Sequence, residues 1–395
     1  MAAPKMSVGK PTADRLPCNT TSFQKKSRSK LVSIPGTRPS IQNGQLIVST
    51  GVTSLDYVIG GGLAVGTLLL IEEDRYDSYS RMLLKYFLAE GVVCGHELYV
   101  ASALDHPNDI LQELPAPILD DIASPKTEDQ AKSCDPESQD AMKIAWRYQN
   151  LPKVQTALAS SSRFGHYYDV SKTMDPEICQ AARCHGFYLP EHSTTVTSPT
   201  ATTPGQSPMP ETYSSLLNNL QEVIHREGFD GSVPQSLTHS LTLTQTKSRN
   251  ILRIGLHSLG SALWDDDLCC RENPSHGHAL TTFLYGLRAM LRSSLSVAVV
   301  TVPSHLIQNR ALMGNITRLC DTAIALESFR GSERETNPLY KDYHGLLDVR
   351  QLPYLNCLVC DLPDNKDLAF KLKRKQFTIE VGLCHHNNPF ECVVT

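Results

Sequence analysis

Four acidic residues lie where the sequence otherwise has the frame of a phosphate-binding loop. The apolar run Thr67–Ile71 is typical of a buried strand, and 81–89 carries apolar residues at helical spacing. A strand, a loop and a helix also frame the motif G-x-x-x-x-G-K-[ST]. Its glycines expose backbone N–H groups to phosphates, its lysine reaches the outer phosphates and its hydroxyl holds Mg²⁺. After Glu72, this chain has E-D-R-Y-D-S-Y-S at 73–80 instead.

Of the four defining residues of the motif, residues 73–80 contain only the last, the hydroxyl residue. Glu73 takes the place of the first glycine and Ser78 that of the second. Tyr79 replaces the lysine, while Ser80 preserves the hydroxyl. Four carboxylates would face the phosphate charges, and each like-charge pair at about 4 Å costs on the order of 4 kcal/mol at an effective dielectric of 20. We expect no ATP here, although an ordinary strand–helix connection unrelated to nucleotides is an alternative for this window alone.

A second motif has also lost its metal-binding residue. Asn250–Leu256 is a predicted strand, followed by His257-Ser258-Leu259-Gly260. A strand of this kind in a nucleotide enzyme ends in an aspartate that orders the water shell of Mg²⁺, a cation that prefers oxygen ligands. His257 stands in that position, so we expect neither catalysis nor a metal or other cofactor. An alternative is that His257 is an ordinary buried or capped histidine, unrelated to a metal-binding motif.

The remaining pattern predicts an α/β fold. Strand, helix and strand at 67–71, 81–89 and 97–101 form a βαβ unit, which implies a parallel sheet. Further strands are predicted at 296–302 and 320–326, helices at 213–227 and 278–292, and late antiparallel strands at 345–349 and 377–381. We therefore predict a mostly parallel twisted sheet flanked by helices, with degenerate Walker motifs.

Composition divides the chain into one domain with tails. Residues 1–44 form a predicted disordered basic tail, which either is simply solvated or loosely contacts RNA or a partner. The domain spans 45–380, with flexible insertions at about 105–140, 190–211 and 230–249, and 381–395 is an irregular tail. Cys384, His385, His386 and Cys392 in that tail have adjacent ligands that fit one tetrahedral ion poorly.

Bulk properties exclude several classes of protein. The net charge of -4 gives no overall signal for nucleic acid, and there is no apolar run of about 18 residues that would span a membrane. Twelve cysteines without an export signal indicate reduced thiols in the cytoplasm or the nucleus.

The segment from Ser49 to Gly66 resembles the start of RecA/RadA-type ATPases. That family has S-T-G-x-x-x-L-D-x-x-L-G-G-G-[IL]-x-x-G before its phosphate loop. This chain has S-T-G-V-T-S-L-D-Y-V-I-G-G-G-L-A-V-G without a gap. The resemblance implies a RecA-like fold, and the changed loop and His257 imply that the fold has lost its catalytic residues.

The whole chain further resembles the family of RecA-like Elongator subunits to which the fourth subunit belongs. The likeness lies in 35–40, 49–66, 70–74, 257–261 and 299–305. It implies a non-catalytic subunit of a hetero-hexameric ring with two related RecA-like subunits. The ring would assist a catalytic core that modifies the wobble uridine of tRNA, in cytoplasm and nucleus. Alternatives are an active ring ATPase with partner-supplied residues, a scaffold associated with transcription elongation, and a monomeric interaction module.

The resemblance also implies where RNA would be contacted. In this fold the loop after the strand Val297–Val302 faces the ring's lumen, and here it runs from Pro303 to Arg310. We expect His305, Gln308 and Arg310 to contribute to contact with the tRNA backbone, although a loop that merely caps the sheet is an alternative.

Overall fold

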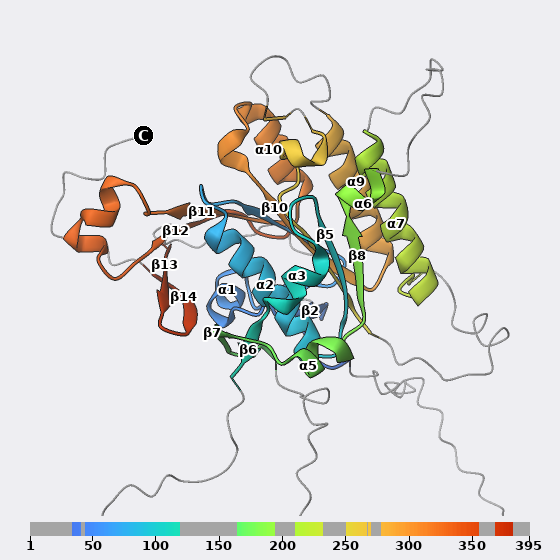
Figure 1. The fold of residues 1–395 in the computed structure, drawn as a ribbon, viewed down its shortest axis with the longest axis horizontal. Helices are drawn as coiled ribbons and strands as arrows, with labels where there is room; N and C mark the ends of the chain where they lie inside the picture. Colours follow the sequence, from blue (N-terminus) through green and yellow to red (C-terminus); the bar gives the residue numbers. More distant parts are fainter. Residues whose placement is uncertain are drawn as a thin grey trace, which may run out of the picture. The chain divides into compact units, whose positions relative to one another are not determined.

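A nine-stranded sheet forms the centre of the fold (Figure 1). The computed structural model describes residues 34–40, 44–118, 164–193, 210–231, 250–266, 268–269, 278–354 and 368–381. The strands lie in the order β8 (Cys184–Tyr188), β5 (Glu97–Ser102), β9 (Leu252–Leu256), β10 (Ser296–Val302), β4 (Leu68–Glu72), β11 (Thr322–Ser328), β12 (Gly345–Gln351), β13 (Leu368–Lys373) and β14 (Gln376–Val381).

The sheet changes direction at β11. The strands from β8 to β11 pair in parallel, and β12, β13 and β14 continue the sheet in antiparallel pairing. The predicted α/β class, with a mostly parallel sheet flanked by helices, is therefore confirmed. The late antiparallel strands are confirmed as well, with β13 as a member that the sequence analysis did not include.

Alternation along the central strands divides the core between the two faces of the sheet. In β4, Leu69 and Ile71 join one buried cluster, while Leu68 and Leu70 join the other. The first cluster contains residues of α2 (Ser78–Val93) and α3 (Pro107–Gln112). The second contains residues of α7 (Glu211–Glu227), α9 (Ala279–Ser293) and α10 (Arg310–Leu319). Continuous apolar runs thus form strands here because both faces are covered.

Order begins before residue 45, where the sequence analysis expected the domain to start. Thr37–Pro39 forms β1, which pairs with β2 (Leu46–Val48), and β2 pairs with β3 (Leu63–Ala64). Part of the expected insertion at 105–140 is also regular: α3 lies there, as does β6 (Pro115–Pro117), which pairs with β7 (Tyr168–Thr173). Residues 1–33, 119–163, 194–209, 232–249 and 382–395 lie outside the described residues, and with them most of the predicted tails and insertions.

A buried charge network connects the start of the domain to the sheet. The Arg253 guanidinium is fully buried and donates to the backbone oxygens of Ser49 (2.8 Å) and Phe87 (3.1 Å), while its Nε donates to His96 (2.9 Å). Glu90 accepts from Tyr168 at 2.6 Å. Burial by itself would raise the pKa of Glu90, but the hydrogen bond from His166 and the charge of Arg253 hold it at about 2.

The remaining helices are short, and none of those described is both long and apolar enough to cross a membrane. They are α1 (Thr53–Val58), α5 (Pro176–Ala181) and α6 (Leu189–Ser193), together with the 3-10 helices η4 (Ala262–Trp264), η5 (Ser304–Leu306), η6 (Glu333–Thr336) and η7 (Pro338–Tyr340).

Candidate functional site

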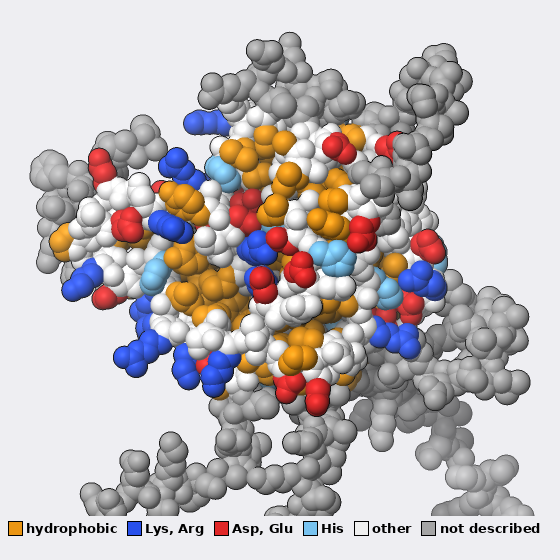
Figure 2. Space-filling model, viewed as in Figure 1, with side chains coloured by type: hydrophobic (Ala, Val, Ile, Leu, Met, Phe, Trp, Pro, Cys, Tyr) orange, Lys and Arg blue, Asp and Glu red, His pale blue; other side chains and the backbone are white. Residues whose placement is uncertain are grey.

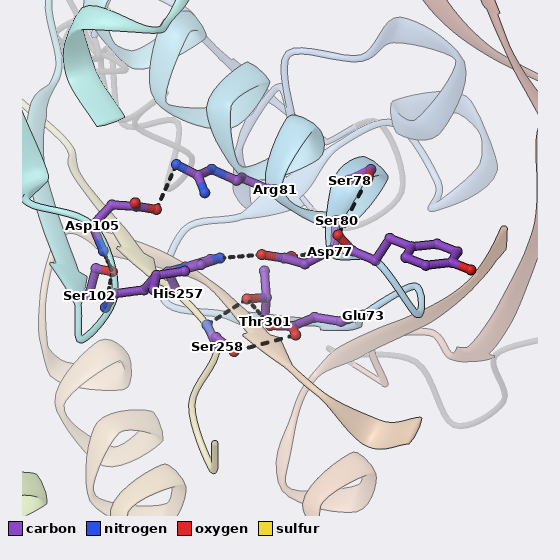
Figure 3. A network of polar contacts seen from close by, with 12 residues as sticks. Glu73, Asp77, Ser78, Ser80, Arg81, Ser102, Asp105, His257, Ser258 and Thr301 are labelled. Carbon is purple, nitrogen blue, oxygen red and sulfur yellow. Dashed lines mark hydrogen bonds and ion pairs between the residues drawn. The ribbon is translucent and has the colours of Figure 1, made fainter. Parts of the chain in front are cut away.

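The two altered motifs meet at the carboxyl edge of the parallel sheet. Glu73 follows β4, His257 follows β9, and Asp77 precedes the first residue of α2. Crevices at this edge are where ligands of α/β proteins usually bind. Figure 3 shows His257 and Asp77 pointing toward each other, with Glu73 directed toward Ser258 and Thr301. The structure therefore brings the sequence-predicted residues Glu73, Ser78, Ser80 and His257 into one site.

The carboxylate of Asp74 occupies the amino end of α2. Its Oδ1 accepts hydrogen bonds from the backbone N–H groups of Tyr79 (2.9 Å) and Ser80 (3.0 Å), and its Oδ2 accepts from that of Ser78 (3.1 Å). Asp74 itself is only 1 % exposed. The first N–H groups of a helix have no partner within the helix, and together with the helix dipole they form an anion site. Here a side chain of the same loop provides that anion.

The role of the acidic loop therefore differs from the expected one. From the sequence, all four carboxylates were expected to repel the charges of a phosphate. The structure instead uses one of them as an internal substitute for a phosphate, so the donors that would hold an external phosphate are engaged. Ser80, which keeps the motif's hydroxyl, is buried, and its Oγ lies 2.9 Å from Asp74 Oδ1 and 2.8 Å from Asp77 Oδ1.

Tyr79, in the place of the lysine, packs away from the site. Its ring centroid lies 4.6 Å from that of Phe370 on β13 and 6.4 Å from that of Phe377 on β14. An aromatic ring here therefore joins α2 to the antiparallel end of the sheet, where a lysine would have extended toward phosphates.

His257 lies within hydrogen-bond distance of a carboxylate at the position where the motif would have an aspartate. Its Nε2 lies 2.7 Å from Asp77 Oδ2, and its side chain is 2 % exposed. Its backbone oxygen accepts a hydrogen bond from Trp264 Nε1 at 3.0 Å. Asp77 adopts a left-handed backbone conformation with φ of 50°, which is uncommon for a residue other than glycine. The contact with His257 thus joins this bend to the end of β9.

Glu73 completes the polar network. Its Oε1 accepts from Thr301 Oγ1 at 2.7 Å, and its Oε2 lies 3.4 Å from Ser258 Oγ. Burial, and then the charge of Asp77, raises the pKa of Glu73 to about 7. An uncharged Glu73 would remove one negative charge from a site that already contains Asp74 and Asp77.

Three clusters of the described residues have metal-ligand chemistry. Ligand atoms of Glu73, Asp77 and His257 all lie within 4.8 Å of one another, and the other two clusters are Glu90–Cys94–His166 and Glu97–His185–Glu227. In the first cluster, the His257–Asp77 pair and the hydrogen bonds of Glu73 give each ligand residue a protein partner. The expected absence of a metal stays a prediction.

The loop that was expected to contact RNA begins beside this site. The backbone N–H of Glu73 donates to Val302 O at 2.9 Å, so the end of β10 lies against the acidic loop. After it, η5 leads to Asn309, whose Oδ1 accepts from the N–H groups of Ala311 and Leu312 and caps α10.

His305, Gln308 and Arg310 are all exposed on this segment. The exposure leaves them accessible to a ligand but does not test the expected contact.

Sequence reasoning missed the two residues that organise the site. Asp74 and Asp77 were noticed only as charges, because the helix was predicted from residue 81, whereas α2 begins at Ser78. An acidic residue just before a helix is a known capping signal. With the helix start placed correctly, that signal would have pointed to Asp77, immediately before Ser78, whereas the backbone donors of the first turn bind Asp74.

Comparisons with known proteins give a consistent result over nearly the whole chain. The family model described as PAXNEB protein matches residues 30–383. A zebrafish (Danio rerio) protein named Elongator complex protein 4 is 70% identical over 363 residues, covering 92% of this chain and 87% of the relative.

More distant proteins match as well. The human protein of the same name is 56% identical, with 95% and 87% covered, and that of Drosophila melanogaster is 34% identical, with 91% and 92% covered. Among solved structures, a KaiC-like protein from Pyrococcus horikoshii OT3 aligns with a TM-score of 0.39 at 10% identity, covering 85% of this chain and 98% of that one.

Replacing Asp74 by alanine should destabilise the protein by about 1–3 kcal/mol, because three backbone donors in the first turn of α2 would lose their buried acceptor. Urea denaturation followed by circular dichroism measures this. Asp342→Ala, at an exposed position, is the control and should change stability by no more than about 0.5 kcal/mol. Equal stability of the Asp74 variant and the wild type would contradict the capping role.

Replacing Glu73 by glutamine should stabilise the protein at high pH. The pKa of Glu73 rises from 4.5 to about 7 on folding, so Glu73 loses its proton at a lower pH in the unfolded chain than in the folded protein. The free energy of unfolding therefore falls as the pH rises from about 4.5 to 7. The variant escapes this loss and should be more stable by on the order of 1–3 kcal/mol at pH 8, with the difference vanishing near pH 4. Denaturation midpoints across this range measure it.

Glu333→Gln, at an exposed position in η6, should show no such pH-dependent difference. A Glu73→Gln stabilisation that is the same at pH 4 and pH 8 would disprove the titration.

Proposed function

The chain belongs to the PAXNEB family, together with relatives named Elongator complex protein 4, and we propose that it acts in the Elongator complex without catalysing a reaction itself. In this proposal it is an accessory RecA-like subunit of a hetero-hexameric ring. Two related RecA-like Elongator subunits and the catalytic core are its protein partners, and the ring binds tRNA and supports modification of the wobble uridine. Cytoplasm and nucleus are the proposed locations.

The observation that carries the non-catalytic role is the contact of Asp74 with the amino end of α2. A nucleotide could use these backbone donors only after the buried carboxylate moved out of the way. Even then no lysine would reach its outer phosphates, because Tyr79 is packed against Phe370. His257, occupied by Asp77, offers no carboxylate for the water shell of Mg²⁺.

Exposed groups beside this site support a role in holding RNA. Arg310 is a cation at the surface, and His305 and Gln308 add hydrogen-bonding groups on the same segment. Contacts of this kind attach phosphates in any sequence and so position an RNA without reading its bases. A subunit with a closed nucleotide site can supply such contacts.

The isolated chain should show no saturable binding of Mg-ATP in a calorimetric titration up to about 1 mM, which corresponds to about -4 kcal/mol. In the assembled complex, Ser80→Ala in this chain should leave ATP turnover unchanged. Loss of turnover in that variant, with the complex still assembled, would instead support an active ring ATPase that uses partner-supplied residues.

Replacing Arg310 by alanine should weaken tRNA binding by the assembled complex and lower the slope of log K against log salt by about 0.7–0.9, the value for one lost phosphate contact. Gel shifts at several salt concentrations measure both quantities. Arg318→Ala, an exposed arginine of α10, is the matched control. An unchanged affinity and slope for Arg310→Ala would reject this contact.

A further inference from the structure

A basic hairpin protrudes from the antiparallel edge of the sheet. Arg374 and Lys375 form the turn between β13 and β14, and Lys371 and Lys373 precede it on β13. The side chains of Lys373 and Lys375 are 64% and 60% exposed. Figure 2 shows blue side chains gathered at the lower left, where Figure 1 places these strands.

Two nearby carboxylates only partly compensate these charges. Glu380 pairs with Lys371 and lies 3.5 Å from Lys373, and Asp169 lies 3.4 Å from Lys375. Arg374 has no ion pair with any of the residues that the structure describes. The hairpin thus carries more cations than anions in a chain whose net charge is -4. This local excess is the electrostatic condition for binding a polyanion.

A pocket opens directly beside the turn. It has a volume of about 270 Å³, and residues 376–378 of β14 form one of its walls. Three tyrosines contribute to the remaining lining: Tyr86 and Tyr168 are buried, and Tyr167 lies at the surface. Tyr167 is 43% exposed, so part of its surface remains open to a ligand.

One polar side chain in this wall can contact an edge of a ligand. The side chain of Gln376, also part of the lining, offers both a donor and an acceptor. An aromatic surface with hydrogen-bonding groups beside it fits a flat heterocycle better than it fits an alkyl chain.

We propose that this pocket and the basic hairpin together bind an unpaired nucleotide of RNA, with the base against Tyr167 and the flanking phosphates at Lys373, Arg374 and Lys375. The inference rests on the proposed function, in which the chain contacts tRNA, and adds the part of the RNA and the surface. Proteins recognise RNA mostly at unpaired bases, by stacking on aromatic rings, while cations follow the backbone.

An acidic peptide would satisfy the cations but would not explain the pocket. Phosphates and carboxylates make similar contacts with lysine and arginine, whereas the exposed ring of Tyr167 and the amide of Gln376 beside it suit a base. The site also lies on strands different from the loop 303–310. Neutralising the hairpin therefore leaves Arg310 intact, and the two contacts can be tested separately.

The test measures binding of labelled oligouridylate, blunt-ended RNA duplex and tRNA to the full-length chain, alone and assembled with its co-purified partners. Lys373→Ala/Arg374→Ala should weaken oligouridylate binding about tenfold and lower the salt slope by about 1.4, or about 0.7 per phosphate on a single strand. Tyr167→Leu should weaken it about tenfold with the slope unchanged, since a stacked base contributes this much.

Matched variants keep these results interpretable. Tyr167→Phe preserves the ring and should bind like the wild type, as should Arg318→Ala on α10, and thermal denaturation verifies that each variant is folded. Selective loss of oligouridylate relative to duplex in the Tyr167→Leu variant supports the base pocket.

Three results would overturn the inference. If tRNA and oligouridylate bind the hairpin and Tyr167 variants as tightly as the wild type, this surface is not used, while the proposed tRNA contact stands. If poly-glutamate displaces oligouridylate as effectively as unlabelled RNA does, the site selects charge rather than a nucleotide. If the wild-type chain and its assembly bind no RNA at all, the tRNA part of the proposed function fails together with it.

Discussion

An anion at the amino end of α2 is the constraint on which the site depends. The first N–H groups of the helix lack helical partners, and the helix dipole favours negative charge there. A nucleotide enzyme leaves this place for phosphate. This chain fills it with Asp74, whose buried carboxylate accepts from three successive backbone donors. The requirement for an anion has been satisfied within the fold, so the helix is stable without a ligand.

Because Asp74 supplies this anion, the neighbouring residues Tyr79 and His257 need not bind a phosphate or a metal ion. A lysine beside Asp74 would no longer meet a phosphate, and Tyr79 instead packs on Phe370 and ties α2 to the antiparallel strands. An aspartate at 257 would add negative charge next to Asp77, whereas His257 accommodates that carboxylate at 2.7 Å. At this edge of the sheet Asp74 thus binds the first turn of α2 and Asp77 binds His257, so these residues contact one another.

The sequence predicted most of the fold because the central strands are unambiguous. The β-branched run of β10 favours a strand, and the single apolar face of α9 favours a helix. β8, with the sequence C-H-G-F-Y, was missed because it is short, mixed in polarity and defined only by pairing with β5. α10 was not predicted, and only its first residue, Arg310, was assigned to the loop after β10. The chemistry at Asp74 could not be predicted either, since it depends on where α2 begins and on a bend with φ of 50° at Asp77.

The acidic residues at this edge of the sheet also affect where a polyanion can approach. Glu73 and Asp77 lie there with Thr301 and His257 already engaged as their partners, so an RNA phosphate placed there would meet carboxylates rather than free donors. Cations lie instead on its flanks, at Arg310 after β10 and at the turn Arg374–Lys375. The carboxylates at this edge and the cations beside it therefore both favour binding of RNA away from the edge. In the proposed function, a bound RNA would therefore lie away from the carboxylates at the edge of the sheet and contact the cations on its flanks.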